Sequence, residues 1–263
     1  MPTDPAALPL LHHGHIELTG RIIEASNATL LGTVACDGVS AECVYKPIMG
    51  ERPLWDFPDG TLAGREVASW LVSEATGWSL VPPTVLRSGP LGPGMVQLWI
   101  DTAAEPGLVD VVALGAVPSG WRTVLRARDR YGDPALLVHA DTEGLRRLAV
   151  LDVLLNNADR KGGHVLAGSR GAVYGVDHGI CLHREDKLRT VLWGFLGQPL
   201  SVAALEVLRR VRSSLEGALG ASLAEHLTRA EVRAVVTRTD HLLATGTFPA
   251  PNGNWPAIPW PAF

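Results

Sequence analysis

The first hundred residues alternate between apolar and polar positions with a period of two, which predicts a small antiparallel sheet. Asp37-Gly38 is a typical two-residue hairpin turn between two of the strand-like runs. Pro47 ends the third run because proline has no N–H for the strand ladder. The expected strands are residues 16–23, 29–36 and 41–46, a short strand from Val85, and residues 94–100.

Helical periodicity occurs once within this region and dominates the chain after Pro106. The first helix is expected between a capping residue, Thr61, and a terminating glycine, Gly77. The tail is rich in Pro and Trp, and it is expected to lie as an extended strap over the core because exposed Trp is costly. The predicted segments are helices at 62–76 and 142–156, two or three helices within 202–245, an irregular stretch at 117–133, a hairpin around 162–177, and the strap at 252–263.

These elements predict an α+β protein with two lobes, a β-rich N-lobe with one helix (1–101) and a mostly helical C-lobe (102–263). The chain is 46% hydrophobic and 19% charged, which excludes a disordered or fibrous protein. A formal net charge of -4 gives no electrostatic support for nucleic-acid binding, so the expected partners are small molecules or proteins.

The three cysteines, Cys36, Cys43 and Cys181, lack a CxxC spacing and favour a reducing compartment, so a cytoplasmic location is expected. No apolar run approaches the length that spans a bilayer. The oligomeric state is left open by the sequence.

A polar loop and hairpin carry the first group of candidate site residues. A four-residue turn at 168–171 would place His164 opposite Gly175 and make it a diagonal neighbour of Asp177, at about 7–8 Å. With Asp159 just upstream, two acids and an imidazole form a candidate seat for a divalent cation beside a general base. The alternative is that these residues only serve the turns, where Asp, Asn and Gly are common.

The second group combines a strand lysine with a helix glutamate. Lys46 ends the third strand, and Glu66 borders the apolar stripe of the helix that follows. A partly buried carboxylate needs a cation, and Lys46 is the nearest in sequence. An ordinary structural salt bridge is the alternative.

The order of these parts is that of a kinase site, with a strand Lys, a helix Glu, an Asp loop and a second Asp before Gly. The sequence resembles an uncharacterised, mainly actinobacterial family that is distantly similar to the phosphatidylinositol 3- and 4-kinases of the protein-kinase-like superfamily. The likeness covers residues 20–183. It implies a kinase-like fold that binds ATP and Mg²⁺ or Mn²⁺ between the lobes and transfers a phosphoryl group to a lipid, metabolite or protein hydroxyl.

The resemblance also implies individual roles. Lys46 would bind the α- and β-phosphates, with Glu66 holding it. Asn157-Ala158-Asp159-Arg160 resembles the catalytic loop, with Asp159 as base, and His164 stands where kinases have a metal-binding Asn. Asp177-His178-Gly179 resembles the Asp-Phe-Gly element, with Asp177 as the main metal ligand.

Residues 96–101 resemble the strand that enters the hinge, where Gln97 lies and where the backbone of Trp99 or Ile100 would bond adenine. Lys161 follows the proposed base closely enough to steady a transferring phosphate.

Two departures keep other functions open. A G-x-G-x-x-G motif is absent between the first strands, and Ser26 and Asn27 are the expected phosphate contacts instead. His164 is a softer ligand than Mg²⁺ prefers. The alternatives are a nucleotide-binding pseudokinase and an AMP-transferring enzyme on the same fold. A metal-dependent phosphohydrolase would leave Lys46 and Glu66 without a role.

Overall fold

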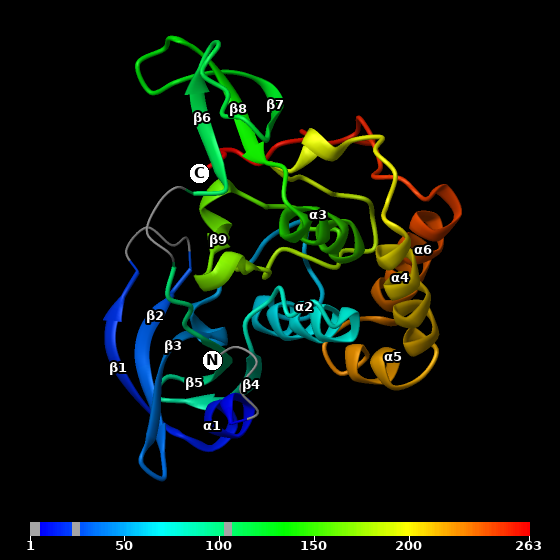
Figure 1. Cartoon of the computed structure of the whole chain (residues 1–263). Helices are drawn as coiled ribbons and strands as arrows, with labels where there is room; N and C mark the ends of the chain where they lie inside the picture. Colours follow the sequence, from blue (N-terminus) through cyan, green and yellow to red (C-terminus); the bar gives the residue numbers. More distant parts are fainter. Residues whose placement is uncertain (1–5, 23–26, 103–106) are drawn as a thin grey trace.

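Two hydrophobic cores organise the chain in the computed structural model, which describes residues 6–22, 27–102 and 107–263 (Figure 1). The smaller core lies between a five-stranded sheet and a short helix near the N-terminus. The larger core contains the remaining helices. This confirms the expected α+β fold, with a β-rich N-terminal region and a largely helical C-terminal part.

The five-stranded sheet has the strand order β1-β2-β3-β5-β4 and is antiparallel throughout. The predicted meander of the first three strands is confirmed. Asp37 and Gly38 both adopt positive φ angles, 49° and 79°, as a tight hairpin turn between twisted strands requires. The strands are β1 (His15–Arg21), β2 (Leu30–Cys36), β3 (Val39–Pro47), β4 (Thr84–Gly89) and β5 (Gly92–Leu98).

A helix that the sequence analysis did not predict, α1 (Ala7–His13), covers one face of this sheet. Its Leu10 and Leu11 are buried against sheet residues such as Val34. The N-terminal region therefore holds two helices rather than one. At seven residues, α1 is too short to show a clear helical period, and its stability comes from packing on the sheet.

The predicted helix after the third strand is α2 (Leu62–Thr76), with the expected ends. The Thr61 hydroxyl accepts a hydrogen bond from the Gly64 N–H at 2.9 Å, and Gly77 ends the helix in the left-handed conformation. Although α2 lies early in the chain, its Ala68 and Val72 pack in the larger core. The larger core therefore includes a helix from the N-terminal region.

The C-terminal part has the predicted long helix, hairpin and final helices. Thr142 and Asn156 cap the long helix, as the expected limits of 142–156 imply. The elements are α3 (Glu143–Leu155), β9 (Val165–Ala167), β10 (Val173–Gly175), α4 (Val202–Leu215), α5 (Ala218–Leu223) and α6 (Arg229–Thr245), with single-turn 3₁₀ helices η1 (Ile48–Gly50), η2 (Gly162–His164), η3 (Ser169–Gly171) and η4 (Trp193–Phe195).

A second sheet, which was not predicted, spans residues 109–140 and includes the stretch 117–133 that was expected to be irregular. It has the order β6-β8-β7 and projects from the body at the top of Figure 1. Its strands are β6 (Val109–Ala113), β7 (Trp121–Arg128) and β8 (Pro134–Ala140). The strand β7 lies at the edge of this sheet and is largely exposed, so it carries several arginines. It therefore lacks the alternation of apolar residues from which a strand is predicted.

The tail lies over the larger core as an extended segment, as predicted, with Ile258 and Ala262 packed on it. The expected burial of its tryptophans is wrong for Trp260, which is 91% exposed. The Ala257 carbonyl accepts hydrogen bonds from the Thr190 N–H and the Trp193 indole, at 3.1 and 2.7 Å. The Trp255 ring lies 4.0 Å from the Lys187 ammonium. Among the described residues, the helices are all too short or too polar to cross a membrane.

A buried ion pair attaches α2 to the larger core. Arg65 of α2 contacts Glu231 of α6 at 2.5 Å, and the two side chains are 1% and 3% exposed. Arg65 also donates to the carbonyl oxygens of Cys181 and Asp59. The helix that carries Glu66 is therefore fixed to the C-terminal helices as well as to the sheet.

Replacing Arg65 with Met should lower the free energy of unfolding by about 3–5 kcal/mol, because Glu231 would keep a buried charge without its partner. Urea denaturation measures this change. The double variant Arg65→Met/Glu231→Gln should lose less than the sum of the two single variants. Additive losses would show that the two side chains are not coupled.

Candidate functional site

The ammonium group of Lys46 lies where the two cores meet. Lys46 is the penultimate residue of β3, and its Nζ is 2.6 Å from Glu66 Oε1 and 2.8 Å from Asp177 Oδ1. Asp177 follows β10, so a strand, a helix and a distant loop converge on one amine. The structure thus brings together three of the predicted site residues.

Glu66 joins this group to the loop after the hairpin. Its Oε1 contacts Lys46, and its Oε2 accepts a hydrogen bond from the backbone N–H of His178 at 2.9 Å. The Glu66 side chain is only 1% exposed. Both carboxylate oxygens are therefore used, which holds the segment containing Asp177 in one position relative to α2.

The ionisation of this group follows from its contacts. Burial alone would lower the pKa of Lys46, but Asp177 and Glu66 together outweigh burial and raise it above its ordinary value. The Lys46 ammonium holds the pKa of Asp177, whose side chain is 50% exposed, well below its usual range. Burial raises the pKa of Glu66, opposed by Lys46. Lys46 and Asp177 are thus charged at neutral pH.

The loop after α3 positions Asp159. The Asn157 side chain accepts a hydrogen bond from the Asp159 N–H at 2.9 Å, and it donates to the buried Asp152 at 3.1 Å. The Asp159 carboxylate contacts Lys161 Nζ at 3.3 Å. Burial raises the pKa of Asp159, while Lys161 and His164 oppose this rise. The predicted base and the predicted phosphate contact are therefore already paired.

His164 lies between the base loop and Asp177. Its Nδ1 is 3.0 Å from the Asp159 carbonyl oxygen, and its Nε2 is 3.5 Å from Asp177 Oδ2. Burial lowers the pKa of His164, so the ring is neutral at pH 7. His164 thus lies beside both acids, next to the backbone carbonyl of Asp159 and the carboxylate of Asp177.

The expected register of the hairpin is wrong by one residue. Ala167 pairs with Val173 and Val165 pairs with Gly175, so His164 falls just outside the ladder, in η2. Asp177 adopts a left-handed backbone with φ of 61°, which turns the chain away from a regular strand. The two side chains meet through these two irregular segments and not as diagonal neighbours in a sheet.

Sequence reasoning missed the role of Arg160. Its guanidinium is fully buried and contacts Asp152 at 2.9 Å. It also donates to the carbonyl oxygens of His164 and Val176 at 3.1 and 3.0 Å, and to His178 Nε2 at 2.7 Å. One buried cation therefore fixes both the His164 segment and the Asp177 segment.

The glycine at position 175 is the one sequence feature connected with this role of Arg160. A Cβ at that position would meet the Arg160 guanidinium and the Leu148 side chain. The glycine leaves room for the arginine beneath β10. The need for glycine at this position can be recognised only once the fold shows that residues 160 and 175 are in contact.

The residues predicted to contact the adenine and phosphates are less well placed. Ser26 lies outside the described residues. The Asn27 Oδ1 accepts a hydrogen bond from the Arg52 N–H at 2.9 Å, which holds the turn onto the η1 region. Gln97 pairs with Val44, but its side chain is 4% exposed and donates to Thr84 Oγ1 at 2.8 Å.

The Trp99 N–H donates to the Glu42 carbonyl oxygen at 3.0 Å and is therefore not available to adenine. The pairing with β3 thus continues to Trp99, one residue beyond the end of β5. Ile100, the second residue proposed for this contact, is 7% exposed.

Metal ligands are few in the part of the chain that the structure describes, where no group of three or more His, Cys, Asp or Glu side chains is arranged to hold an ion. Asp177 Oδ2 and His164 Nε2 are the two predicted ligands that face each other. They fit an ion that takes its other ligands from phosphate and water, as Mg²⁺ and Mn²⁺ do in nucleotide sites.

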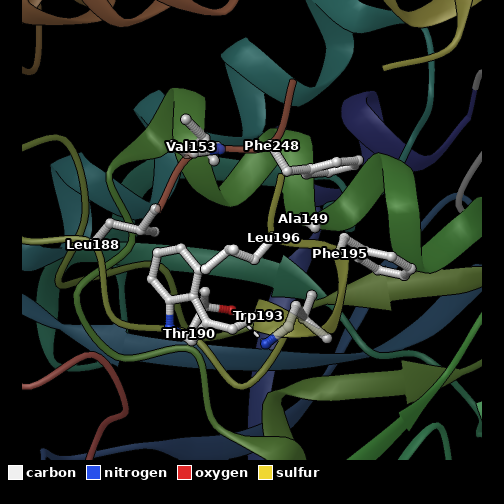
Figure 2. Close-up of a pocket in the computed structure, with 10 residues that line it drawn as sticks. Ala149, Val153, Leu188, Thr190, Trp193, Phe195, Leu196 and Phe248 are labelled. Carbon is white, nitrogen blue, oxygen red and sulfur yellow. Dashed lines mark hydrogen bonds between the residues drawn. The ribbon is translucent and has the colours of Figure 1, made fainter. Parts of the chain in front are cut away.

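Two cavities lie away from this group. One is a small apolar cavity of about 10 Å³ in the larger core. Its lining residues include Trp193, Phe195 and Phe248 (Figure 2). This volume admits about one water molecule. A cavity of about 300 Å³ lies between the first turns of α3 and α4. Neither cavity contains a predicted site residue.

Replacing His178 with Phe should weaken the dependence of stability on pH. Burial, with Arg160 beside it, holds the pKa of His178 well below that of an unfolded histidine. Below about pH 6.5 the unfolded chain therefore binds this proton and the folded chain does not, so stability falls as pH falls. The variant should lose about 1 kcal/mol per pH unit of this slope between pH 6 and 5, measured by urea denaturation.

The control for this measurement is His241→Asn, which changes an exposed side chain of α6 and should keep the wild-type slope. A wild-type slope in His178→Phe would contradict the assignment of a neutral, buried imidazole.

Comparisons with known proteins place the chain among relatives. Protein Rv2133c of Mycobacterium tuberculosis (strain ATCC 25618 / H37Rv) is 51% identical, over 97% of this chain and 94% of the relative. The Helicobacter pylori proinflammatory kinase CtkA has a crystal structure with a TM-score of 0.42 and 12% identity, over 90% of this chain and 94% of that chain. At this TM-score the likeness is too distant to bear on the chemistry of the site. No protein-family model matches. The identity to Rv2133c shows that the chain belongs to the same family as that actinobacterial protein.

Proposed function

We propose that this protein is an ATP-dependent, metal-dependent phosphotransferase that acts on a hydroxyl group. The observation that supports this most directly is the position of Lys46, which lies 2.6 Å from Glu66 and 2.8 Å from Asp177. An amine held between a helix carboxylate and a loop carboxylate, with a further Asp in a neighbouring loop, is the arrangement that kinases use. The proposal includes the distant kinship with phosphatidylinositol kinases and a cytoplasmic location.

The charges of the site support a cation as part of the functional complex. Three carboxylates, Glu66, Asp159 and Asp177, face two ammonium groups, Lys46 and Lys161, which leaves one uncompensated negative charge. The buried Arg160 is matched by Asp152 and does not change this balance. A divalent ion would reverse the sign of the site and favour the binding of a triphosphate.

Asp177 and His164 would hold the ion, and the ion would supply Lewis-acid stabilisation of the phosphoryl oxygens. Lys46 would release part of its contact with Asp177 and bind the α- and β-phosphates. Glu66 would keep the ammonium in place, because its other oxygen is fixed by the His178 N–H. Each residue thus has a task that matches its present contacts.

In the reaction, the acceptor oxygen forms a bond to the γ-phosphorus of ATP. The bond between this phosphorus and the oxygen that bridges the β- and γ-phosphates breaks, and ADP leaves. Asp159 takes the proton of the acceptor hydroxyl. Burial raises the pKa of this carboxyl, which makes it a better proton acceptor than an exposed aspartate. Lys161, 3.3 Å from Asp159, lies close enough to the base to stabilise charge on the transferring group.

Replacing Asp177 with Asn should reduce phosphotransfer by at least about 10³-fold, because the amide removes the charge that holds Lys46 and the ion. Asn adopts the left-handed backbone at position 177 readily, so the fold should persist. Lys46→Ala should have an effect of similar size. Conversion of ATP, followed chromatographically with Mg²⁺ or Mn²⁺, measures the rate.

The matched control is Asp240→Asn, which removes a surface carboxylate that pairs with Arg212 and should leave the rate unchanged. Activity at the wild-type level in both site variants would exclude the proposal. Products separate the alternatives: ADP indicates phosphoryl transfer, pyrophosphate indicates AMP transfer, and ATP binding without conversion indicates a pseudokinase.

A further inference from the structure

The imidazole of His164 has a defined orientation. Its Nδ1 lies 3.0 Å from the Asp159 carbonyl oxygen, which can only accept a hydrogen bond. In the neutral ring the proton is therefore on Nδ1, and Nε2 carries a lone pair. Backbone carbonyls often fix metal-binding histidines in this way, by holding the ring nitrogen that does not bind the ion.

The other ring nitrogen, Nε2, faces a carboxylate oxygen of Asp177. His164 Nε2 is 3.5 Å from Asp177 Oδ2, while Lys46 already occupies the other oxygen of Asp177. Two lone pairs therefore converge on one point. This separation is longer than a normal hydrogen bond and is suited to two ligands that share one ion.

Buried contacts hold the two ligands at this separation. Arg160 donates to the backbone carbonyl of His164 and to that of Val176, the residue before Asp177. Asp152 fixes the guanidinium, and both side chains are fully buried. The ligand segments are tied to the same buried cation, so the site is organised before an ion binds.

A nitrogen ligand discriminates between ions of similar size. Mg²⁺ prefers oxygen ligands, whereas first-row transition metals accept imidazole readily. We propose that the Asp177–His164 pair is a binding site for a first-row divalent transition-metal ion, which it selects over Mg²⁺ through direct coordination by His164 Nε2. This proposal depends on the proposed function in one respect, because a bound nucleotide would supply the remaining ligands of the ion.

Electron paramagnetic resonance tests direct coordination in the unaltered protein. With Mn²⁺ and ADP bound, pulsed measurements should detect hyperfine coupling to an imidazole nitrogen. The coupling should disappear in His164→Asn and persist in His241→Asn, a control that changes an exposed histidine of α6. Bound Mn²⁺ without nitrogen coupling in the wild type would overturn the proposal, as would coupling that survives in His164→Asn.

Competition between Mn²⁺ and Mg²⁺ measures the selectivity. Changing His164 to Asn should lower the preference for Mn²⁺ over Mg²⁺ by at least about tenfold. Loss of a residue that only supports a metal ligand already lowers metal affinity by about 10- to 100-fold, and loss of the ligand itself should lower it at least as much. An unchanged ratio of affinities would overturn the proposal. Thermal unfolding of the metal-free variants establishes that each is folded. These readouts do not depend on turnover, so an inactive protein that binds Mn²⁺ through nitrogen would refute only the phosphotransferase function.

Discussion

Lys46 joins two hydrophobic cores, because its amine extends from the sheet of the smaller core and both of its carboxylate partners belong to segments packed on the larger one. An ammonium group buried beside one carboxylate would already be well compensated. A second carboxylate, Asp177, leaves the site with an excess of negative charge. That excess is a local electrostatic constraint, and the cation proposed for this site would relieve it.

The attachment of α2 gives this constraint its rigidity. Glu66 and Arg65 are neighbours on α2, and Arg65 is bound to Glu231 of α6 while Glu66 is bound to Lys46. The helix therefore couples the sheet to the C-terminal helices through two consecutive ion pairs. Because α2 also packs on β4 and β5, the sheet and the larger core are joined through the helix that carries Glu66.

Beneath the site, Asp152 and Arg160 form the second buried pair on which the geometry depends. A buried guanidinium has five donors, and here it uses them on a carboxylate, two carbonyl oxygens and an imidazole. Among the described residues His178 Nδ1 has no partner, but every donor of the guanidinium has one, as a stable buried network requires. It therefore specifies one arrangement of the base loop and the Asp177 loop and disfavours others.

The sequence by itself determined what depends on local chemistry. The alternation of residues 29–46, the Asp37-Gly38 turn and the Thr61 and Gly77 ends of α2 are all set by neighbours a few residues away. The order of Lys46, Glu66 and Asp177 along the chain identified the amine and the two acids that meet. Segments with weak periodicity, such as α1 and the edge strand β7, were not predicted from the sequence. They are stabilised by packing partners that lie far away in the chain.

Only the tertiary structure decided which charged groups pair with one another and which backbone donors already have a hydrogen-bond partner. The one-residue shift of the hairpin, the loss of the Trp99 N–H to Glu42 and the clamp formed by Arg160 all arise from contacts between segments far apart in the chain. A sequence records which donors and acceptors exist. Their pairing depends on distances of a few ångströms, and those distances are set when both cores have packed.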